Sequence, residues 1–114
     1  MSFIIIYSKD YDRVIPAVII DAREGTPIAN QIGIVIKAYI DEVLNSITSN
    51  SIFYTLSTSD AVLAGYFILT VDKENSTVVL NSILLRPAFQ KNITEVTLQI
   101  NNFIAGNTWK NDYL

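Results

Sequence analysis

The sequence contains no histidine and no cysteine, and these two absences exclude several kinds of site. Without cysteine there are no disulfides, no thiolate nucleophiles and no thiolate metal ligands. Without histidine, the most common general base and the most common transition-metal ligand are both missing. We therefore predict no metal site and no hydrolase triad built on histidine.

Charged residues are also scarce. They make up 17% of the 114 residues, whereas 50% of the residues are hydrophobic, and a typical soluble domain has about 25% charged residues. The net charge is -3, and the eight basic residues are scattered singly, so no basic stripe is available to follow a nucleic acid. A surface with few charges is expected to carry apolar patches, which often mark interfaces. We expect a homo-oligomer or a component of a larger assembly.

The apolar segment "SFIII" near the N-terminus is only a few residues long. It has no basic region before it and no small-residue cleavage site after it, so it predicts a buried strand rather than a signal peptide or a membrane span. The expected location is the cytoplasm or a virion. The expected partners are proteins, with neither nucleic acid nor a membrane among them. The length suits a single domain over residues 1–114.

Apolar runs bounded by turn-forming residues predict four strands and a hairpin turn. The strands cover Phe3–Tyr7, Ile52–Leu56, Leu63–Val71 and Thr77–Leu85, and the turn covers Asp72–Asn75. These runs are too continuous for a sheet with one wet face, so helices should cover both faces. Between the first two strands the spacing predicts a short helix over Arg13–Glu24 and a longer helix over Thr26–Ile47 with one apolar stripe.

The segment after the fourth strand fits two structures. Val96, Leu98 and Ile100 alternate with polar residues, as in a half-buried strand. A helix would instead place five apolar residues on one face and end at Gly106; these residues are Ile93, Val96, Ile100, Phe103 and Ile104. Asn92 and Glu95 favour the helix because they have the spacing of a capping box, in which each side chain binds a backbone amide of the first turn.

Two motifs give the chain a family resemblance. Gly65-Tyr66 opens the third strand, and "LLRPAFQ" follows along the fourth. With the order strand, helix, helix, strand, strand, strand, helix, they resemble the GCN5-related N-acetyltransferase (GNAT) superfamily. The resemblance implies an α/β (α+β) fold with a mixed, mostly antiparallel sheet covered by helices. It also implies an acetyl-CoA site at the turn before the last helix, formed here by Pro87, Phe89, Gln90, Lys91, Asn92 and Ile93.

The sequence departs from the family where the cofactor pyrophosphate would lie. The family has small residues, mostly glycine, at the positions of Ile93 and Glu95, so that backbone amides can approach the phosphates. Ile93 adds bulk there, and Glu95 adds a carboxylate that repels an anion. The family also continues with further strands, whereas this chain ends about eight residues after Gly106. We therefore expect a shortened scaffold whose cofactor loop is degenerate.

The preferred function is non-catalytic: a structural or assembly protein that acts through protein–protein contacts and needs no cofactor. Trp109, Tyr113 and Leu114 are either a hook that inserts into a partner or a tail that lies on its own core. Abundant Ile and Asn are typical of an AT-rich genome, and a bacteriophage virion is one repeated assembly that would fit. The alternatives are a minimal acyl-CoA-dependent N-acyltransferase acting on an amine and a ligand-binding regulatory subunit.

Overall fold

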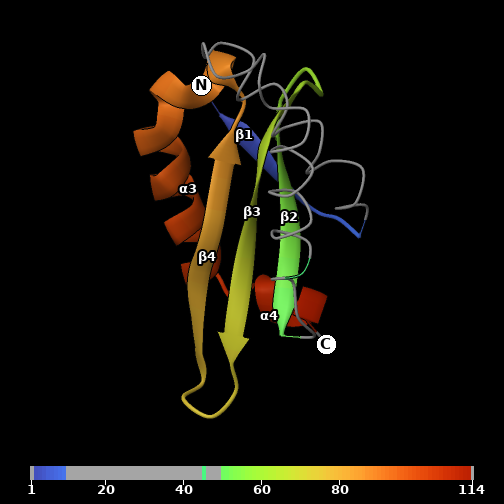
Figure 1. Ribbon diagram of the computed structural model, residues 1–114, viewed down its shortest axis with the longest axis vertical. Coiled ribbons are helices and arrows are strands. Elements are labelled where there is room, and N and C mark those ends of the chain that lie inside the picture. Colours follow the sequence, from blue (N-terminus) through green and yellow to red (C-terminus); the bar gives the residue numbers. More distant parts are fainter. Residues whose placement is uncertain (1, 10–44, 46–49, 114) are drawn as a thin grey trace.

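The computed structural model describes residues 2–9, 45 and 50–113. These residues form an α+β structure with a four-stranded sheet and a C-terminal helical segment (Figure 1). In chain order the elements are β1 (Phe3–Tyr7), β2 (Ser51–Thr58), β3 (Leu63–Asp72), β4 (Thr77–Leu85), the 3-10 helix η2 (Pro87–Asn92), α3 (Ile93–Ala105) and α4 (Trp109–Tyr113). The helices predicted over Arg13–Glu24 and Thr26–Ile47 lie outside the described residues.

The strands lie side by side in the order β1-β2-β3-β4, and every neighbouring pair is antiparallel. All four predicted strands are confirmed, and β2 and β3 are slightly longer than predicted. The prediction of a mixed sheet is wrong for the described strands. Four residues join β2 to β3 and four join β3 to β4, and connections this short can only join antiparallel neighbours.

The hairpin turn between β3 and β4 is built around the carboxylate of Asp72. Its Oδ1 accepts hydrogen bonds from the backbone N–H groups of Glu74 (3.1 Å) and Asn75 (3.3 Å), and its Oδ2 accepts one from Asn75 Nδ2 (2.7 Å). These bonds, above all the one from the Asn75 side chain, hold the pKa of Asp72 below its ordinary value. The predicted hairpin is confirmed, and Asp72 acts in it as an Asx-turn residue.

One face of the sheet forms the main core with α3 and α4. Tyr54 stacks on Phe67 with 5.1 Å between ring centroids, and Phe103 of α3 meets Tyr54 edge-on at 4.9 Å. Val96 and Ile100 of α3 and Trp109 of α4 are buried in the same cluster. Such ring pairs add about 0.5–1.5 kcal/mol each beyond the burial of their area. This packing holds α3 across the sheet.

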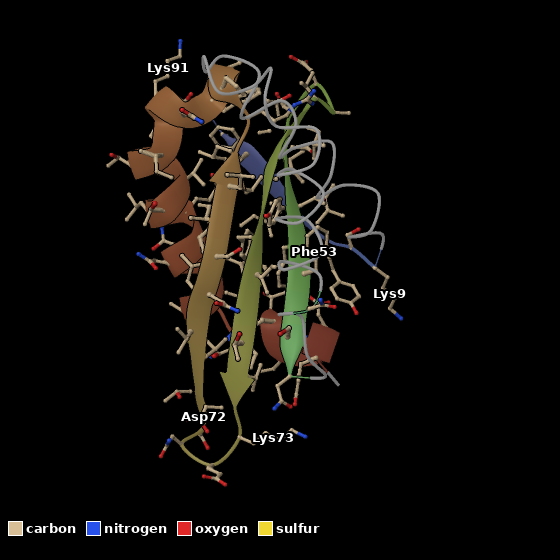
Figure 2. All side chains as sticks on the ribbon, viewed as in Figure 1. Lys9, Phe53, Asp72, Lys73 and Lys91 are labelled. Atoms are coloured by element: carbon tan, nitrogen blue, oxygen red, sulfur yellow. The ribbon has the colours of Figure 1, made fainter. Side chains whose placement is uncertain are left out.

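The opposite face of β2 and β3 is also buried. Phe53, Tyr66 and Ile68 point to this face and are at most 3% exposed, and Figure 2 shows Phe53 on the side of the sheet away from α3. The prediction that the sheet has no wet face is therefore confirmed for its two central strands. The described helices α3 and α4 lie on the first face only.

The choice of a helix for the segment after β4 is confirmed, with two differences in detail. Ile93 was predicted to lie on the buried face but is 43% exposed, so the apolar stripe reaches the core only from Val96 onward. A helical wheel gives the direction of a side chain but not the extent of the surface beneath it. Gly106 ends the helix as expected, yet with φ −73°; the left-handed residue is Asn107, with φ 62°.

Candidate functional site

The turn that the family resemblance assigned to a cofactor, Pro87–Ile93, consists of the 3-10 helix η2 (Pro87–Asn92) and the first residue of α3. The Phe89 side chain packs on the core, edge-on to Phe3 at 6.0 Å between centroids. The backbone N–H of Phe89 donates to the Arg86 carbonyl (2.9 Å), and the N–H of Ile93 donates to the Gln90 carbonyl. These amides are bonded within the chain itself, so they do not form an open cradle for a phosphate.

The predicted capping box at Asn92 and Glu95 is wrong in its Asn92 half. The Asn92 side chain makes no capping hydrogen bond, and its Oδ1 is buried without a partner among the described residues. The reason is the preceding 3-10 turn: where η2 continues into α3, its carbonyls lie next to the first amides of the helix. Backbone groups therefore replace the side-chain cap.

Gly65 has a structural explanation that needs no cofactor. It lies opposite Leu85 in the β3–β4 ladder. A Cβ atom at this position would collide with the Leu84 carbonyl oxygen and would lie 3.0 Å from the Leu85 Cα. The two strands approach each other so closely here that only glycine fits. Arg86 holds the same junction, because its N–H donates to the Ala64 carbonyl (2.8 Å) and its Nη1 to the Leu63 carbonyl (3.1 Å).

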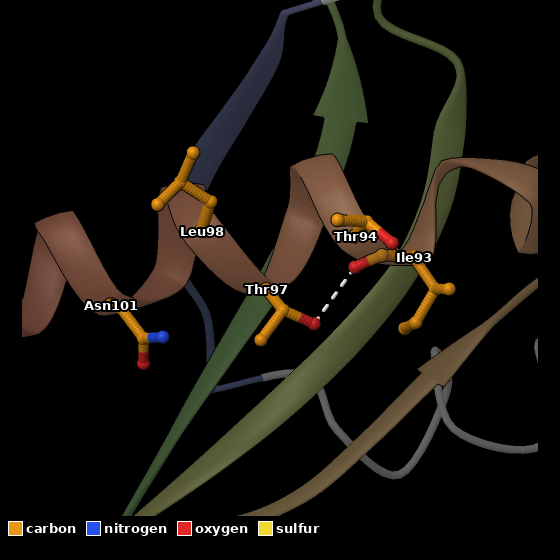
Figure 3. Close-up of a pocket in the computed structure, with 5 residues that line it drawn as sticks. All are labelled: Ile93, Thr94, Thr97, Leu98 and Asn101. Atoms are coloured by element: carbon orange, nitrogen blue, oxygen red, sulfur yellow. Dashed lines mark hydrogen bonds between the residues drawn. The ribbon is translucent and has the colours of Figure 1, made fainter.

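The outer surface of α3 carries two shallow depressions. The first, of about 360 Å³, is lined by Ile93, Thr94, Thr97, Leu98 and Asn101 (Figure 3). Its Thr97 hydroxyl donates to the Ile93 carbonyl of the same helix at 2.8 Å and is thus already engaged. The second is lined by Glu95, Leu98, Gln99 and Asn102. Glu95 is the one charged residue among these lining residues, so neither depression presents a matched acid–base or nucleophile–base pair.

The C-terminal residues predicted to contact a partner lie on the protein's own core. Trp109 is 7% exposed, and its indole N–H donates to the Ile104 carbonyl (3.1 Å). Tyr113 packs against the same core and its hydroxyl bonds the Asn50 side chain (3.0 Å). This is the arrangement of a tail that lies on its own core. An additional contact of these residues with a partner stays a prediction, and Leu114 lies outside the described residues.

A partly buried hydrogen bond joins this tail to the sheet. The hydroxyl of Tyr54 on β2 donates to Asp112 Oδ2 of α4 at 2.6 Å. Burial, together with this bond and the neighbouring negative charge, raises the pKa of Tyr54 far above its ordinary value. Tyr54 therefore keeps its proton at neutral pH and serves as a structural donor rather than as a base.

The two outer strands of the sheet differ in what binds their backbone. On β1, the Gln99 side chain of α3 bonds both backbone groups of Phe3: Oε1 accepts from the Phe3 N–H (3.2 Å), and Nε2 donates to the Phe3 carbonyl. On β4, no described strand pairs with the outer side. β4 is nine residues long and contains no charged residue and no proline.

This outer edge of β4 was not identified from the sequence as a site, although its uncharged run of nine residues was visible there.

Comparisons with protein-family models, with curated proteins and with solved structures found no match. Among the helices that the structure describes, none is long and apolar enough to span a membrane.

Proposed function

We propose that this protein is a non-catalytic assembly protein that associates with other protein chains through the outer edge of β4, which no described strand covers. The observation that carries the proposal is the edge itself. Its nine residues, Thr77–Leu85, include no charge and no proline. Charged residues and proline are the usual means by which proteins stop an outer strand from pairing with another chain. An edge that lacks them is suited to such pairing.

The absence of prepared chemistry in the described part of the chain supports the same proposal. The amides of Phe89 and Ile93 are used within the turn, the Thr97 hydroxyl is used within α3, and Tyr54 is a structural donor. Exposed apolar side chains on the two outer strands are a further reason to expect association. Val79 on β4 is 58% exposed and Ile4 and Ile6 on β1 are each 48% exposed, and such surfaces favour contact with another protein.

The test is the mass of the protein in solution, measured by light scattering over a range of concentrations. We expect a mass well above the 12.7 kDa of one chain. Val79→Lys should lower this mass towards that of a monomer, because a lysine on an outer strand opposes pairing. Leu98→Lys is the matched control, because Leu98 is 62% exposed and belongs to α3 rather than to β4. A monomer at every concentration, or equal effects of both variants, would contradict the proposal.

The minimal acyl-CoA-dependent N-acyltransferase is the weaker proposal, and a bacteriophage virion as the assembly stays a prediction. The enzyme would have to hold acetyl-CoA at Pro87–Ile93, where two amides are already bonded and Ile93 is bulky. Isothermal titration with acetyl-CoA decides between the two. No binding up to millimolar concentration is expected. Micromolar binding that Gln90→Ala weakens and Glu95→Gly strengthens would favour the enzyme.

A further inference from the structure

We infer that the partner of β4 is β4 of a second copy, paired antiparallel about a two-fold axis that passes between Asn81 and Ser82. This inference rests on the proposed function, since it names the partner at the same edge. The result would be a continuous sheet made of two four-stranded halves. Three features of the molecule favour this pairing: a β-bulge in β4, the charges at the two ends of β4 and the contrast with β1.

The bulge changes which residues of β4 face the core. In the ladder with β3, Leu69 lies opposite Leu80 and Ile68 lies opposite Ser82, so Asn81 is an extra residue. An extra residue shifts the alternation of side chains by one position. Leu80 before the bulge and Ile83 after it therefore both pack on the core, although regular alternation would put them on opposite faces.

This shift makes the whole strand self-complementary. Directly opposed residues of an antiparallel pair lie on the same face of the sheet. An axis between Asn81 and Ser82 brings together residues of the same face at every step, and the three apolar pairs on each side are Leu80 with Ile83, Val79 with Leu84, and Val78 with Leu85. Core-facing residues thus meet core-facing residues, and residues of the opposite face meet one another.

The nearest other two-fold register does not have this property. An axis through Asn81 would place Leu80 opposite Ser82, although Leu80 faces the core and Ser82 lies beside Ile68 on the opposite face. Every pair further out would be mismatched in the same way, because the bulge lies between its two members. An axis between Leu80 and Asn81 would also pair most of the strand, but it places the core-facing Leu80 opposite the bulge residue Asn81 and leaves Leu85 without an apolar partner. Registers centred still nearer either end of β4 pair less of the strand. Pairing over residues 78–85, about 27 Å of strand, requires the axis between Asn81 and Ser82.

The charges at the two ends of β4 are complementary in this arrangement. The turn at one end carries Asp72, Lys73 and Glu74. Lys91 lies near the other end, and Figure 2 shows Asp72 and Lys73 at one end of β4 and Lys91 at the other. Lys73 lies over the ring of Tyr113 in the same chain, 5.2 Å from its centroid. Antiparallel pairing brings the acidic turn of one copy towards the Lys91 end of the other, so that opposite charges approach at both ends.

A second copy placed through β1 is disfavoured. β1 has only five residues, and its Phe3 backbone is already bonded by Gln99. Pairing of β1 with β4 of the next copy would also be head-to-tail, which produces rings or open filaments rather than a two-fold dimer.

Disulfide cross-linking tests the register, and the chain has no cysteine of its own to interfere. In the double variant Val79→Cys/Leu84→Cys the two cysteines of each copy lie opposite those of the other, at the Cα separation of about 4.5–5.5 Å that a disulfide needs. Within one copy they are about 17 Å apart along the strand and cannot join. After mild oxidation we expect a covalent dimer, about tenfold or more above the level of either single variant.

Two matched double variants test the competing arrangements. Val79→Cys/Ile83→Cys reports the axis through Asn81, and Ile4→Cys/Val79→Cys reports head-to-tail pairing of β1 with β4, which would give a ladder of covalent oligomers. We expect neither to cross-link. Circular dichroism of the reduced proteins checks that each variant is folded.

The outcomes separate the inference from the proposed function. A covalent dimer of Val79→Cys/Leu84→Cys alone supports both. A dimeric mass of the unmodified chain with cross-linking only in another variant, or in none, overturns this register but leaves association. A monomeric mass at all concentrations overturns both. If a cysteine variant fails to fold, a comparison of the masses of Val79→Lys and Leu98→Lys still decides whether association uses the edge of β4. An oligomer larger than a dimer that persists in both of these lysine variants overturns the inference.

Discussion

The two outer strands of this sheet differ in how far their outer backbone groups are protected from pairing with another chain. β1 is short, and a side-chain amide from α3 binds both backbone groups of Phe3, in the way that a neighbouring strand would. β4 is nearly twice as long, and the described residues provide no comparable cover. Both strands lack charges and proline. The difference therefore lies in strand length and in tertiary contacts, and it makes β4 rather than β1 the edge available to a partner.

The largest loss of stability is expected from Gly65→Ala, which should displace β4 and so remove the difference between the two outer strands. The new methyl group would collide with the Leu84 carbonyl, a backbone atom that cannot move aside cheaply. We expect a loss of about 3 kcal/mol in the free energy of unfolding, at the upper end of the usual range for overpacking. Urea denaturation measures the loss, and light scattering should show weaker association.

Gly106→Ala is the matched control for this substitution. A Cβ at Gly106 would meet the nearest carbonyl oxygens at 3.5 and 3.6 Å, which is ordinary contact, and the φ of −73° suits any residue. Its stability should stay within about 0.5 kcal/mol of the unmodified protein. If both variants lost the same stability, the close approach of β3 and β4 would not be the cause.

A substitution on the core face of the sheet, away from both outer strands, should reduce stability without changing the edge of β1 or β4. Tyr54→Phe removes the hydrogen bond to Asp112, and we expect a loss of about 2 kcal/mol because the acceptor is a carboxylate. The tail should loosen, whereas association through β4 should persist at protein concentrations where the variant is folded. A variant that folds but no longer associates would mean that α4 takes part in the interface.

The same tyrosine predicts a pH dependence. The pKa of Tyr54 is raised in the folded protein, so the unfolded chain releases this proton near its ordinary pKa of 10.0 while the folded chain keeps it. The stability is therefore fully present below about pH 10 and decreases as the pH rises further, by about 1.4 kcal/mol per pH unit for one such group. Urea denaturation between pH 8 and 11, roughly centred on the ordinary value, should show a shallower decrease for Tyr54→Phe.

Removal of Gln99 should make β1 resemble β4. Gln99→Ala leaves the Phe3 N–H and carbonyl without their partners, and we expect a loss of about 1 kcal/mol in stability. The freed edge should also pair with other copies, so light scattering should show species larger than those of the unmodified protein. Asn101→Ala, an exposed change on the same helix, is the control. An unchanged mass for Gln99→Ala would show that its length alone protects β1.

Most of the strands could be predicted because their signals are local. Phe3–Tyr7 and Thr77–Leu85 are apolar runs between turn-forming residues, and the Asp72 turn is determined by the residues next to it. The helix over Ile93–Ala105 was decided by a capping box that the structure does not form. The choice was nevertheless right, because the apolar spacing from Val96 onward also requires a helix to bury Val96 and Ile100.

The features that distinguish the two edges could not be predicted, because each depends on contacts between distant segments. Gln99 and Phe3 are 96 positions apart in the chain. The bulge at Asn81 exists only relative to β3, since nothing in the run of β4 marks one residue as extra. The start of α3 differs from the prediction for a local reason: its amides were expected to be capped by the Asn92 and Glu95 side chains, whereas the 3-10 helix η2 leads directly into α3 and Asn92 makes no capping bond.

The smallest expected effect concerns the charges at the ends of β4, and it sharpens the comparison because it tests the pairing of this edge alone. Lys91→Glu should weaken association by about 0.5 kcal/mol per contact, a factor of two or three, and Glu74→Lys should do the same. The double variant Lys91→Glu/Glu74→Lys exchanges the signs and should recover most of the loss. Because exposed charges are screened within about 10 Å at 0.1 M salt, the differences should shrink at high salt. Dissociation constants from analytical ultracentrifugation measure all three variants. Additive losses in the double variant would mean that the two ends do not meet, and that the two-fold pairing of β4 is wrong.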